Sequence, residues 1–250
     1  MESNELNIAW CYPDMLNLHG DRGNIMALER IGKMLGLNVN VKKIESFQTE
    51  INFDKTDILF FNVGEIRIIE SIVDALNKQK EELDRFIENN KMIIAIGTTG
   101  AAFGKKLIKL DGKQIDCLGY LDMDCNQRDM VYGNDIIFKL NEDESVEING
   151  NQIQMLDIKT NGATILGTVS YGRGNNGEDK GEGAKYKNLV FTNTLGPVLV
   201  KNPWYTEKLI KTAMATKGIQ IENSIPDTDF EVERKSIECI KEYNAKKEKK

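Results

Sequence analysis

The segment MIIAIGTTGAAF, residues 92–103, decides the fold class, because an apolar run leads directly into a sharp Gly/Thr turn and then a helical pattern. Short continuous apolar strands separated by helices are typical of a parallel sheet covered on both faces. A strand-to-helix turn of this kind can also present a nucleophile beside backbone N–H groups. The turn contains no thiol, but Thr98 and Thr99 supply two hydroxyl groups. A Gly-rich connection without chemistry is the alternative interpretation.

Apolar runs and helical patterns continue on both sides of this segment. Between residues 107 and 194 the pattern changes to shorter alternating segments, which indicate an added antiparallel or mixed sheet. We therefore expect an α/β fold with a central, mostly parallel sheet flanked by helices, over residues 1–217, followed by a C-terminal helix and basic tail at 218–250. The expected helices are 24–35, 68–89, 203–216 and 229–243. The expected strands of the first part are 6–12, 37–44, 57–63 and 92–96. Those of the added part are 135–140, 145–148, 152–158, 164–171 and 188–193.

Charge and length exclude several classes of protein. The 250 residues include 33 Lys and Arg against 39 Asp and Glu, a net charge of −6, which argues against nucleic acid or an anionic membrane as the main partner. No apolar run approaches the roughly 20 residues of a membrane span, and the N-terminus lacks a basic segment followed by an apolar one. We expect a cytoplasmic protein without membrane insertion.

The inventory of reactive residues is small. Four scattered cysteines and one histidine do not match a Cys/His zinc pattern, so we expect no metal and no cofactor. Hydrolases of the Ser/His/Asp or Cys/His type need an imidazole as general base. Such a mechanism would have to use His19 here.

Two glycine-rich segments resemble nucleotide-binding motifs only superficially. Residues 172–177, GRGNNG, match GxGxxG, but a strand pattern rather than a helix follows them. Residues 100–106, GAAFGKK, are one residue short of a phosphate loop and have Lys106 in place of the Ser or Thr that binds magnesium. We reject both nucleotide interpretations.

The polar loop at residues 12–24, YPDMLNLHGDRGN, follows the first expected strand. Loops at the carboxyl ends of parallel strands are where open α/β sheets bind ligands. A loop held by internal hydrogen bonds, with no ligand, is the alternative interpretation of these residues.

Three segments together carry a family resemblance: YPDMLNLHGDRGN at 12–24, GRGNNGEDKGEG at 172–183 and GPVLVKNP at 196–203. They resemble the CobB/CobQ-like (cobyric acid synthase type) glutamine amidotransferases, most closely the GatD branch of glutaminase subunits of lipid II isoglutaminyl synthase. The resemblance spans about residues 7–215. It implies a flavodoxin-like, class-I amidotransferase domain that hydrolyses glutamine with a Cys/His pair. It also implies that ammonia passes to an ATP-dependent, Mur-ligase-like partner, MurT, in peptidoglycan synthesis.

The sequence departs from the family where this chemistry takes place. The family's A-I-C-G-G-Y-Q-L-L-G aligns without gaps with AIGTTGAAFG at 95–104, which places Gly97 at the nucleophile. The family's G-T-Y-L-H-G-P aligns with FTNTLGP at 191–197, which places Leu195 at the histidine. The resemblance therefore implies that no catalytic residue is intact.

Other family positions are candidate binding residues. Gly64 lies in the loop that replaces the family's Gly-Gly-Gly-Gln run on the oxyanion side, and Arg128 matches an arginine that contacts glutamine in the family. A surface ion pair is the alternative interpretation of Arg128. The remaining family-motif residues are Asp14, Asn17, Asp21, Arg22, Asn24, Asn175, Asn176 and Glu182.

Three functional hypotheses follow. The first is a non-catalytic or regulatory subunit of a Mur-ligase-like partner, with a small-molecule ligand in the former glutamine pocket as an option. The second is an active amidotransferase subunit that uses Thr98 or a group supplied by the partner. The third is a free-standing small-molecule sensor.

Overall fold

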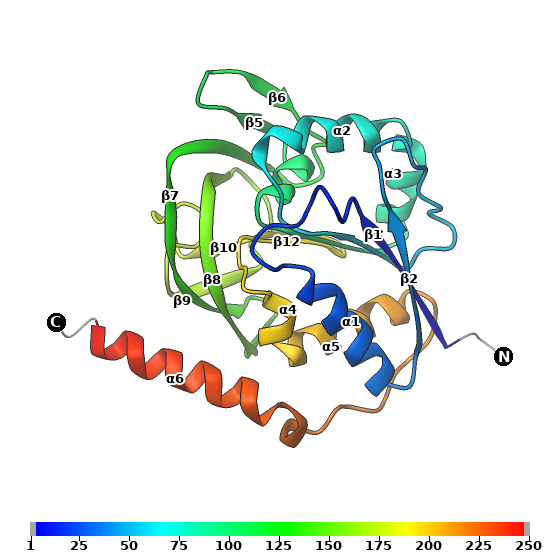
Figure 1. Cartoon of the computed structure of the whole chain (residues 1–250), viewed down its shortest axis with the longest axis vertical. Helices are drawn as coiled ribbons and strands as arrows, with labels where there is room; N and C mark the ends of the chain where they lie inside the picture. The colour runs from blue at the N-terminus through cyan, green and yellow to red at the C-terminus, as the bar shows by residue number, and fades with distance from the viewer. Residues whose placement is uncertain (1–3, 248–250) are drawn as a thin grey trace.

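The computed structural model describes residues 4–247, which form two six-stranded sheets (Figure 1). In the first sheet all neighbouring strands are parallel except at one edge, where β11 (Ala184–Tyr186) is antiparallel to β12 (Leu189–Thr192). This arrangement confirms the α/β fold class with a central, mostly parallel sheet. From edge to edge, its strands are β11 (Ala184–Tyr186), β12 (Leu189–Thr192), β4 (Met92–Ile96), β3 (Ile58–Phe61), β1 (Glu5–Cys11) and β2 (Asn38–Ile44).

Helices cover both faces of this sheet (Figure 1). Successive side chains of a strand point to opposite faces. Ile58 and Phe60 of β3 therefore pack in the core formed with α1 and α5, whereas Leu59 and Phe61 pack in the core formed with α2 and α3. The helices are α1 (Gly23–Met34), α4 (Val198–Lys201) and α5 (Pro203–Ala215) on one face, and α2 (Ile69–Asn77) and α3 (Lys80–Glu88) on the other.

The prediction of one helix over 68–89 is wrong. A 3-10 turn, η1 (Ile66–Ile68), precedes α2, and the backbone leaves the helical region at Gln79 between α2 and α3. The Gln79 side chain accepts from Ile51 N at 3.0 Å and donates to Ile51 O at 3.1 Å. These long-range bonds hold the break in place. The helix expected after residue 97 is also a 3-10 segment, η2 (Gly97–Phe103).

The second sheet is the added part and is mixed, as predicted. Its longest strands, β7 (Met123–Leu140) and β8 (Asp143–Thr160), form one antiparallel hairpin that replaces the shorter segments expected there. The expected strand at 188–193 is instead β12 of the first sheet. Its three apolar side chains and one Thr are all buried, and the strand lies between β4 and β11. The other strands are β5 (Lys106–Ile108), β6 (Gln114–Asp116), β9 (Gly167–Tyr171) and β10 (Gly181–Glu182).

The last described helix lies on the outside of the molecule. After a 3-10 turn, η3 (Asp227–Phe230), α6 (Glu231–Lys247) runs past the face covered by α1, α4 and α5 (Figure 1). Phe230 is 1% exposed and belongs to the core with α1 and α5, whereas α6 itself buries Ile237 and Asn244. Among the described residues, no helix has the length and hydropathy needed to cross a membrane.

Candidate functional site

The carboxyl ends of β1, β3, β4 and β12 meet at one edge of the first sheet, because these strands are parallel. Each is followed by a segment that the sequence marks as a candidate. Open α/β sheets bind their ligands at this edge. The segments are 12–24 after β1, 62–65 after β3, 97–103 after β4 and 193–197 after β12.

Gly97 and Leu195 lie close together at this edge. Gly97 has φ +64°, a left-handed conformation that forms the sharp turn at the end of β4. A Cβ atom at position 97 would lie 2.6 Å from Val63 Cγ2 and 3.3 Å from Leu195 Cδ2. Leu195 is buried, and its backbone bonds to Asn151 in both directions. Apolar side chains therefore fill the space that a side chain at position 97 would need.

The two threonine hydroxyls of the turn bond to the backbone. Thr98 donates to Gly64 O and accepts a longer bond, 3.3 Å, from Gly64 N. Thr99 donates to Ile96 O at 2.9 Å. Each hydroxyl proton is thus held by a carbonyl oxygen rather than by a side-chain base. The Gly64 N–H, which the family resemblance predicts to lie on the oxyanion side, donates to Thr98.

An apolar cleft of about 410 Å³ opens beside this turn. Gly64 and Thr98 line it, as does the exposed His19. The rest of its lining is apolar apart from Glu65, Arg67 and Gln127, and it comes from the segments after β1 and β3 and from β7 and β8. The apolar residues are Leu18, Val63, Ile66, Val131, Ile153 and Met155.

The loop after β1 is connected to its neighbours by buried polar side chains. The Asp21 carboxylate accepts from Val63 N at 3.2 Å and from Asn24 Nδ2 at 2.6 Å. Asn24 Oδ1 accepts from Leu199 N at 2.8 Å. Burial raises the pKa of Asp21 to about 6, and these two bonds to the carboxylate oppose the shift. These buried contacts support the interpretation of a loop held by internal hydrogen bonds.

The other candidates of this loop form an exposed cluster. Arg22 donates to Asp14 at 2.9 Å and to Asn17 at 3.0 Å. The Asp14 side chain is 82% exposed. An ion pair this exposed contributes about 1 kcal/mol or less to stability.

In the segment 172–183, the candidate residues are internal supports. Asn175, which is buried, exchanges two bonds of 2.9 Å with the backbone of Gly183. One oxygen of the buried Glu182 accepts from Thr192 Oγ1, Asn193 N and Thr194 Oγ1, and burial raises the pKa of this carboxyl group. These bonds fix the segment that leads into Leu195.

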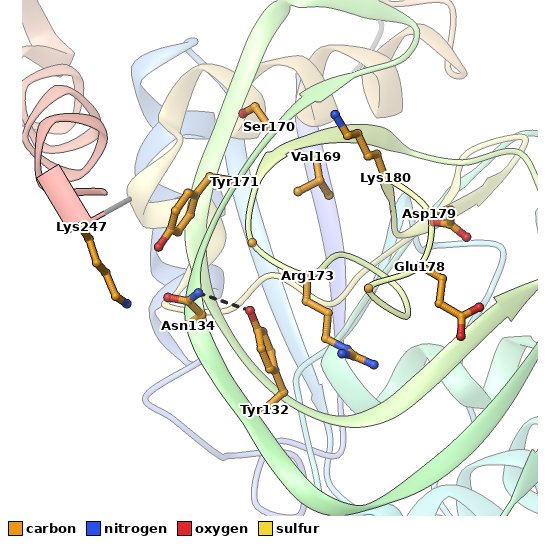
Figure 2. Close-up of a pocket in the computed structure, with 12 residues that line it drawn as sticks. Tyr132, Asn134, Val169, Ser170, Tyr171, Arg173, Glu178, Asp179, Lys180 and Lys247 are labelled. Atoms are coloured by element: carbon orange, nitrogen blue, oxygen red, sulfur yellow. Dashed lines mark hydrogen bonds between the residues drawn. The ribbon is translucent and has the colours of Figure 1, made fainter. Parts of the chain in front are cut away.

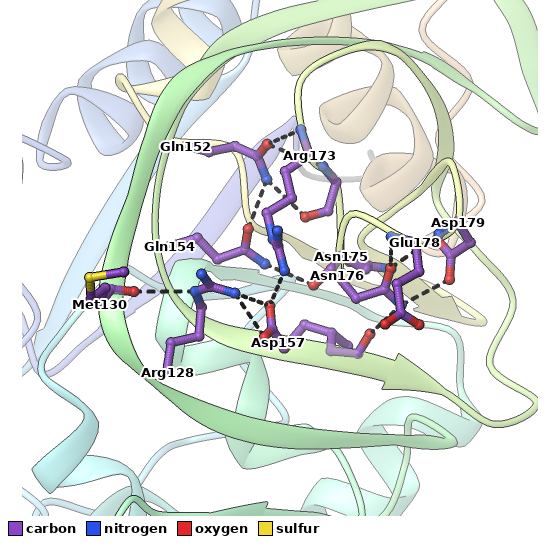
Figure 3. A network of polar contacts seen from close by, with 12 residues as sticks. Arg128, Met130, Gln152, Gln154, Asp157, Arg173, Asn175, Asn176, Glu178 and Asp179 are labelled. Atoms are coloured by element: carbon purple, nitrogen blue, oxygen red, sulfur yellow. Dashed lines mark hydrogen bonds and ion pairs between the residues drawn. The ribbon is translucent and has the colours of Figure 1, made fainter.

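The start of this segment is bonded to β8, as Figure 3 shows. Gln152 Oε1 accepts from the backbone N–H groups of Arg173 and Gly174 at 2.9 and 3.1 Å, and Gln154 Nε2 donates to Asn175 O at 2.8 Å. Asn176 accepts from Glu178 N and Asp179 N and thereby closes the turn that follows. Gln152 and Gln154 were not predicted as site residues from the sequence. The available signal was the alternation of buried positions along β8.

Comparisons with known proteins agree with this geometry. The family model for the CobB/CobQ-like glutamine amidotransferase domain matches residues 7–202. The chain belongs to the CobB/CobQ-like glutamine amidotransferase family. It is 35% identical over 237 residues to the "Lipid II isoglutaminyl synthase (glutamine-hydrolyzing) subunit GatD" of Staphylococcus aureus (strain N315), covering 93% of this chain and 94% of that protein. It is 31% identical to the Streptococcus pneumoniae (strain ATCC BAA-255 / R6) protein of the same name, covering 85% and 82%.

Solved structures share the fold of this amidotransferase family member at low sequence identity. A crystal structure of a glutamine amidotransferase is 14% identical with a TM-score of 0.54 and covers 83% of this chain and 98% of its own. The glutaminase domain of Trypanosoma brucei CTPS with bound acivicin is 10% identical with a TM-score of 0.51 and covers 88% and 96%. These likenesses confirm the class-I glutamine amidotransferase fold.

Arg128, the candidate for substrate contact in this family member, does not line the apolar cleft. One of its guanidinium nitrogens donates to both carboxylate oxygens of Asp157 at 2.8 Å, and Arg173 donates to the same carboxylate at 2.9 Å (Figure 3). The ion-pair interpretation of Arg128 therefore describes this structure. Asp157 lies 29 residues from Arg128, and the sequence carries no local signal for the pair.

Three of the four cysteine thiols are disfavoured as thiolates by burial. Burial raises the pKa of Cys117 to about 12 and also raises the pKa values of Cys11 and Cys125. A thiol must lose its proton to attack. Within residues 4–247, no group of three or more His, Cys, Asp or Glu side chains is placed to hold a metal ion.

Proposed function

We propose that this chain is a GatD-like homologue that has lost glutamine hydrolysis and acts as a non-catalytic or regulatory subunit of a Mur-ligase-like, MurT-type partner. The observation that carries the proposal is the packing at the end of β4, where the side chains of Val63 and Leu195 lie beside Gly97. The extent of similarity to proteins named as GatD subunits supports the retention of a subunit role.

Glutamine hydrolysis needs a thiolate to attack the side-chain amide and an imidazole to move the proton. Gly97 and Leu195 supply neither group. Loss of one member of such a pair usually lowers the rate by several orders of magnitude, and the effects are not additive because the residues act as a unit. With both groups missing, we expect glutaminase activity at background.

The arrangement around Thr98 argues against a threonine mechanism. Its hydroxyl donates to Gly64 O, and the Gly64 N–H that could stabilise an oxyanion is bonded to that hydroxyl. An active complex would therefore need both catalytic groups from the partner.

In the proposed complex, the partner would amidate lipid II or a related carboxylate in the cytoplasm with free ammonia or another amine. This substrate comes from the names of the relatives. This chain would then serve peptidoglycan synthesis by supporting or regulating the ligase rather than by supplying its nitrogen.

The decisive measurement is ammonia release from glutamine by the full chain, alone and co-expressed with the protein encoded by its neighbouring gene. Gly97→Cys, Leu195→His and the double variant form the matched series, and circular dichroism checks that each is folded. We expect no release above the no-enzyme rate from the unmodified chain and a stable complex with the neighbour.

Release by the unmodified chain above the no-enzyme rate would contradict the loss of glutamine hydrolysis. Absence of a complex, together with absence of activity, would contradict the subunit role and favour the free-standing sensor. Activity gained only by the double variant would support the assignment of the two lost positions.

A further inference from the structure

A second hollow lies between the segment 172–180 and strands β7 and β9 (Figure 2). Its volume is about 620 Å³, and it shares no lining residue with the apolar cleft. Tyr132 and Tyr171 line it from β7 and β9, and Lys247 lines it from the end of α6.

The hollow has a preformed wall. Gln152 and Gln154 hold the backbone of residues 173–175 against β8 through four side-chain bonds. The ring of Tyr132 lies 5.5 Å from the guanidinium carbon of Arg173. Because this loop is already ordered, ligand binding does not carry the entropic cost of ordering it.

Cationic side chains from three places surround the hollow: Arg173 at the start of the segment, Lys180 at its end and Lys247 on α6 (Figure 2). Arg173 and Arg128 share the single carboxylate of Asp157, which leaves that cluster with one excess positive charge. Within residues 4–247, Lys180 and Lys247 form no ion pair.

Two acidic residues, Glu178 and Asp179, also line the hollow. Asp179 accepts from Gly181 N at 2.8 Å and from Asn176 Nδ2 at 3.0 Å. These donors are neutral, so Asp179 keeps its negative charge and opposes an anion together with Glu178. The cluster of Arg173, Arg128 and Asp157, with its excess charge of +1, and the two lysines exceed these two carboxylates by one positive charge.

We propose that this hollow binds a small polyanion, a molecule with two or more phosphate or carboxylate groups, through Arg173, Lys180 and Lys247. Cations that come from three separate segments suit a ligand with more than one anionic group. The hydroxyls of Tyr132 and Tyr171 can donate to the same ligand. This binding function is independent of glutamine hydrolysis and of the ligase partner.

Titration calorimetry of the full chain with pyrophosphate and, separately, with citrate tests the proposal. We expect saturable binding of at least one probe at millimolar concentration or below, weakened by added NaCl. Tighter binding of pyrophosphate would identify a phosphorylated ligand, and tighter binding of citrate a polycarboxylate.

Three variants locate the site. Lys180→Met should weaken binding about threefold to tenfold, and Glu178→Gln should strengthen it by a similar factor, because each changes one charge at the hollow. Arg67→Gln removes an exposed arginine from the other cleft and should leave the affinity unchanged.

Circular dichroism and thermal unfolding confirm that the variants are folded. Absence of saturable binding by both probes would overturn the proposal. Equal affinities for the unmodified chain, Lys180→Met and Glu178→Gln would overturn it as well, since the anion would then bind elsewhere.

Discussion

Gly97 has a backbone conformation that strains residues with a Cβ atom. Its φ of +64° forms the turn at the end of β4, at the position that we propose corresponds to the family's nucleophile. Val63 and Leu195 occupy the space beside Gly97.

Substitution of Gly97 by Ala should destabilise the protein by about 2 to 4 kcal/mol, from left-handed strain together with crowding against Val63. Gly20→Ala is the matched control, because Gly20 has φ +71° and nothing lies within 4 Å of the position of its Cβ. We expect that control to cost about 1 to 2 kcal/mol. The free energy of unfolding in urea measures both. Equal costs would show that Val63 moves aside freely.

At the scale of elements, Asp21 connects the loop after β1 to neighbouring parts of the fold. Its carboxylate bonds to the end of β3 and, through Asn24, to the start of α4. The carboxylate is buried, and its pKa is raised from 3.8 to about 6. The arrangement of these elements at the candidate site is therefore linked to a proton.

Because the folded pKa of Asp21 is raised, the folded state binds this proton more tightly than the unfolded state. The resulting stabilisation is fully present below about pH 3.8 and is lost as pH rises through about 6. The free energy of unfolding of the unmodified chain, relative to Asp21→Asn, should fall by on the order of 2 to 3 kcal/mol between those limits.

Urea unfolding at several pH values measures this difference. Asp14→Asn, at an exposed carboxylate of the same loop, controls for the loss of a carboxylate as such. A difference between the unmodified chain and Asp21→Asn that stays constant with pH would contradict the linkage to Asp21.

At the scale of the whole molecule, α6 is the outermost element (Figure 1). It buries Ile237 and Asn244, and Phe230 just before it inserts into the core with α1 and α5. An element with few buried contacts opens locally at a lower free energy than the central sheet does.

Phe230→Ala should therefore speed amide hydrogen exchange throughout α6 and leave exchange in β4 and β12 nearly unchanged. Loss of a buried phenylalanine costs about 3 to 5 kcal/mol where the ring is anchored, and here that cost should appear as opening of α6. Val232→Ala, at a side chain 77% exposed, should change neither region. Uniformly faster exchange across the first sheet would show that α6 unfolds only together with the core.

Several features of this protein follow from its sequence alone. Continuous apolar runs predicted the central strands β1, β3 and β4, because a parallel sheet buried on both faces needs such runs, and an alternating pattern predicted the edge strand β2. The ungapped match to the family singled out Gly97 and Leu195, which lie close together in the structure, and their correspondence to the family's catalytic positions stays a prediction. The prediction of the strands succeeded because it depends on residues adjacent in the sequence.

Other features were decided by contacts between distant segments. Gln79 breaks the expected helix because it bonds to Ile51, 28 residues away, and Arg128 pairs with Asp157, 29 residues away. The strand at 188–193 entered the central sheet because β4 and β11 bury it. Local periodicity reports which side chains favour burial, whereas the partner of each polar group depends on how the segments pack. The sequence by itself therefore determined the fold class, and only the tertiary structure decided that Val63 and Leu195 pack beside Gly97.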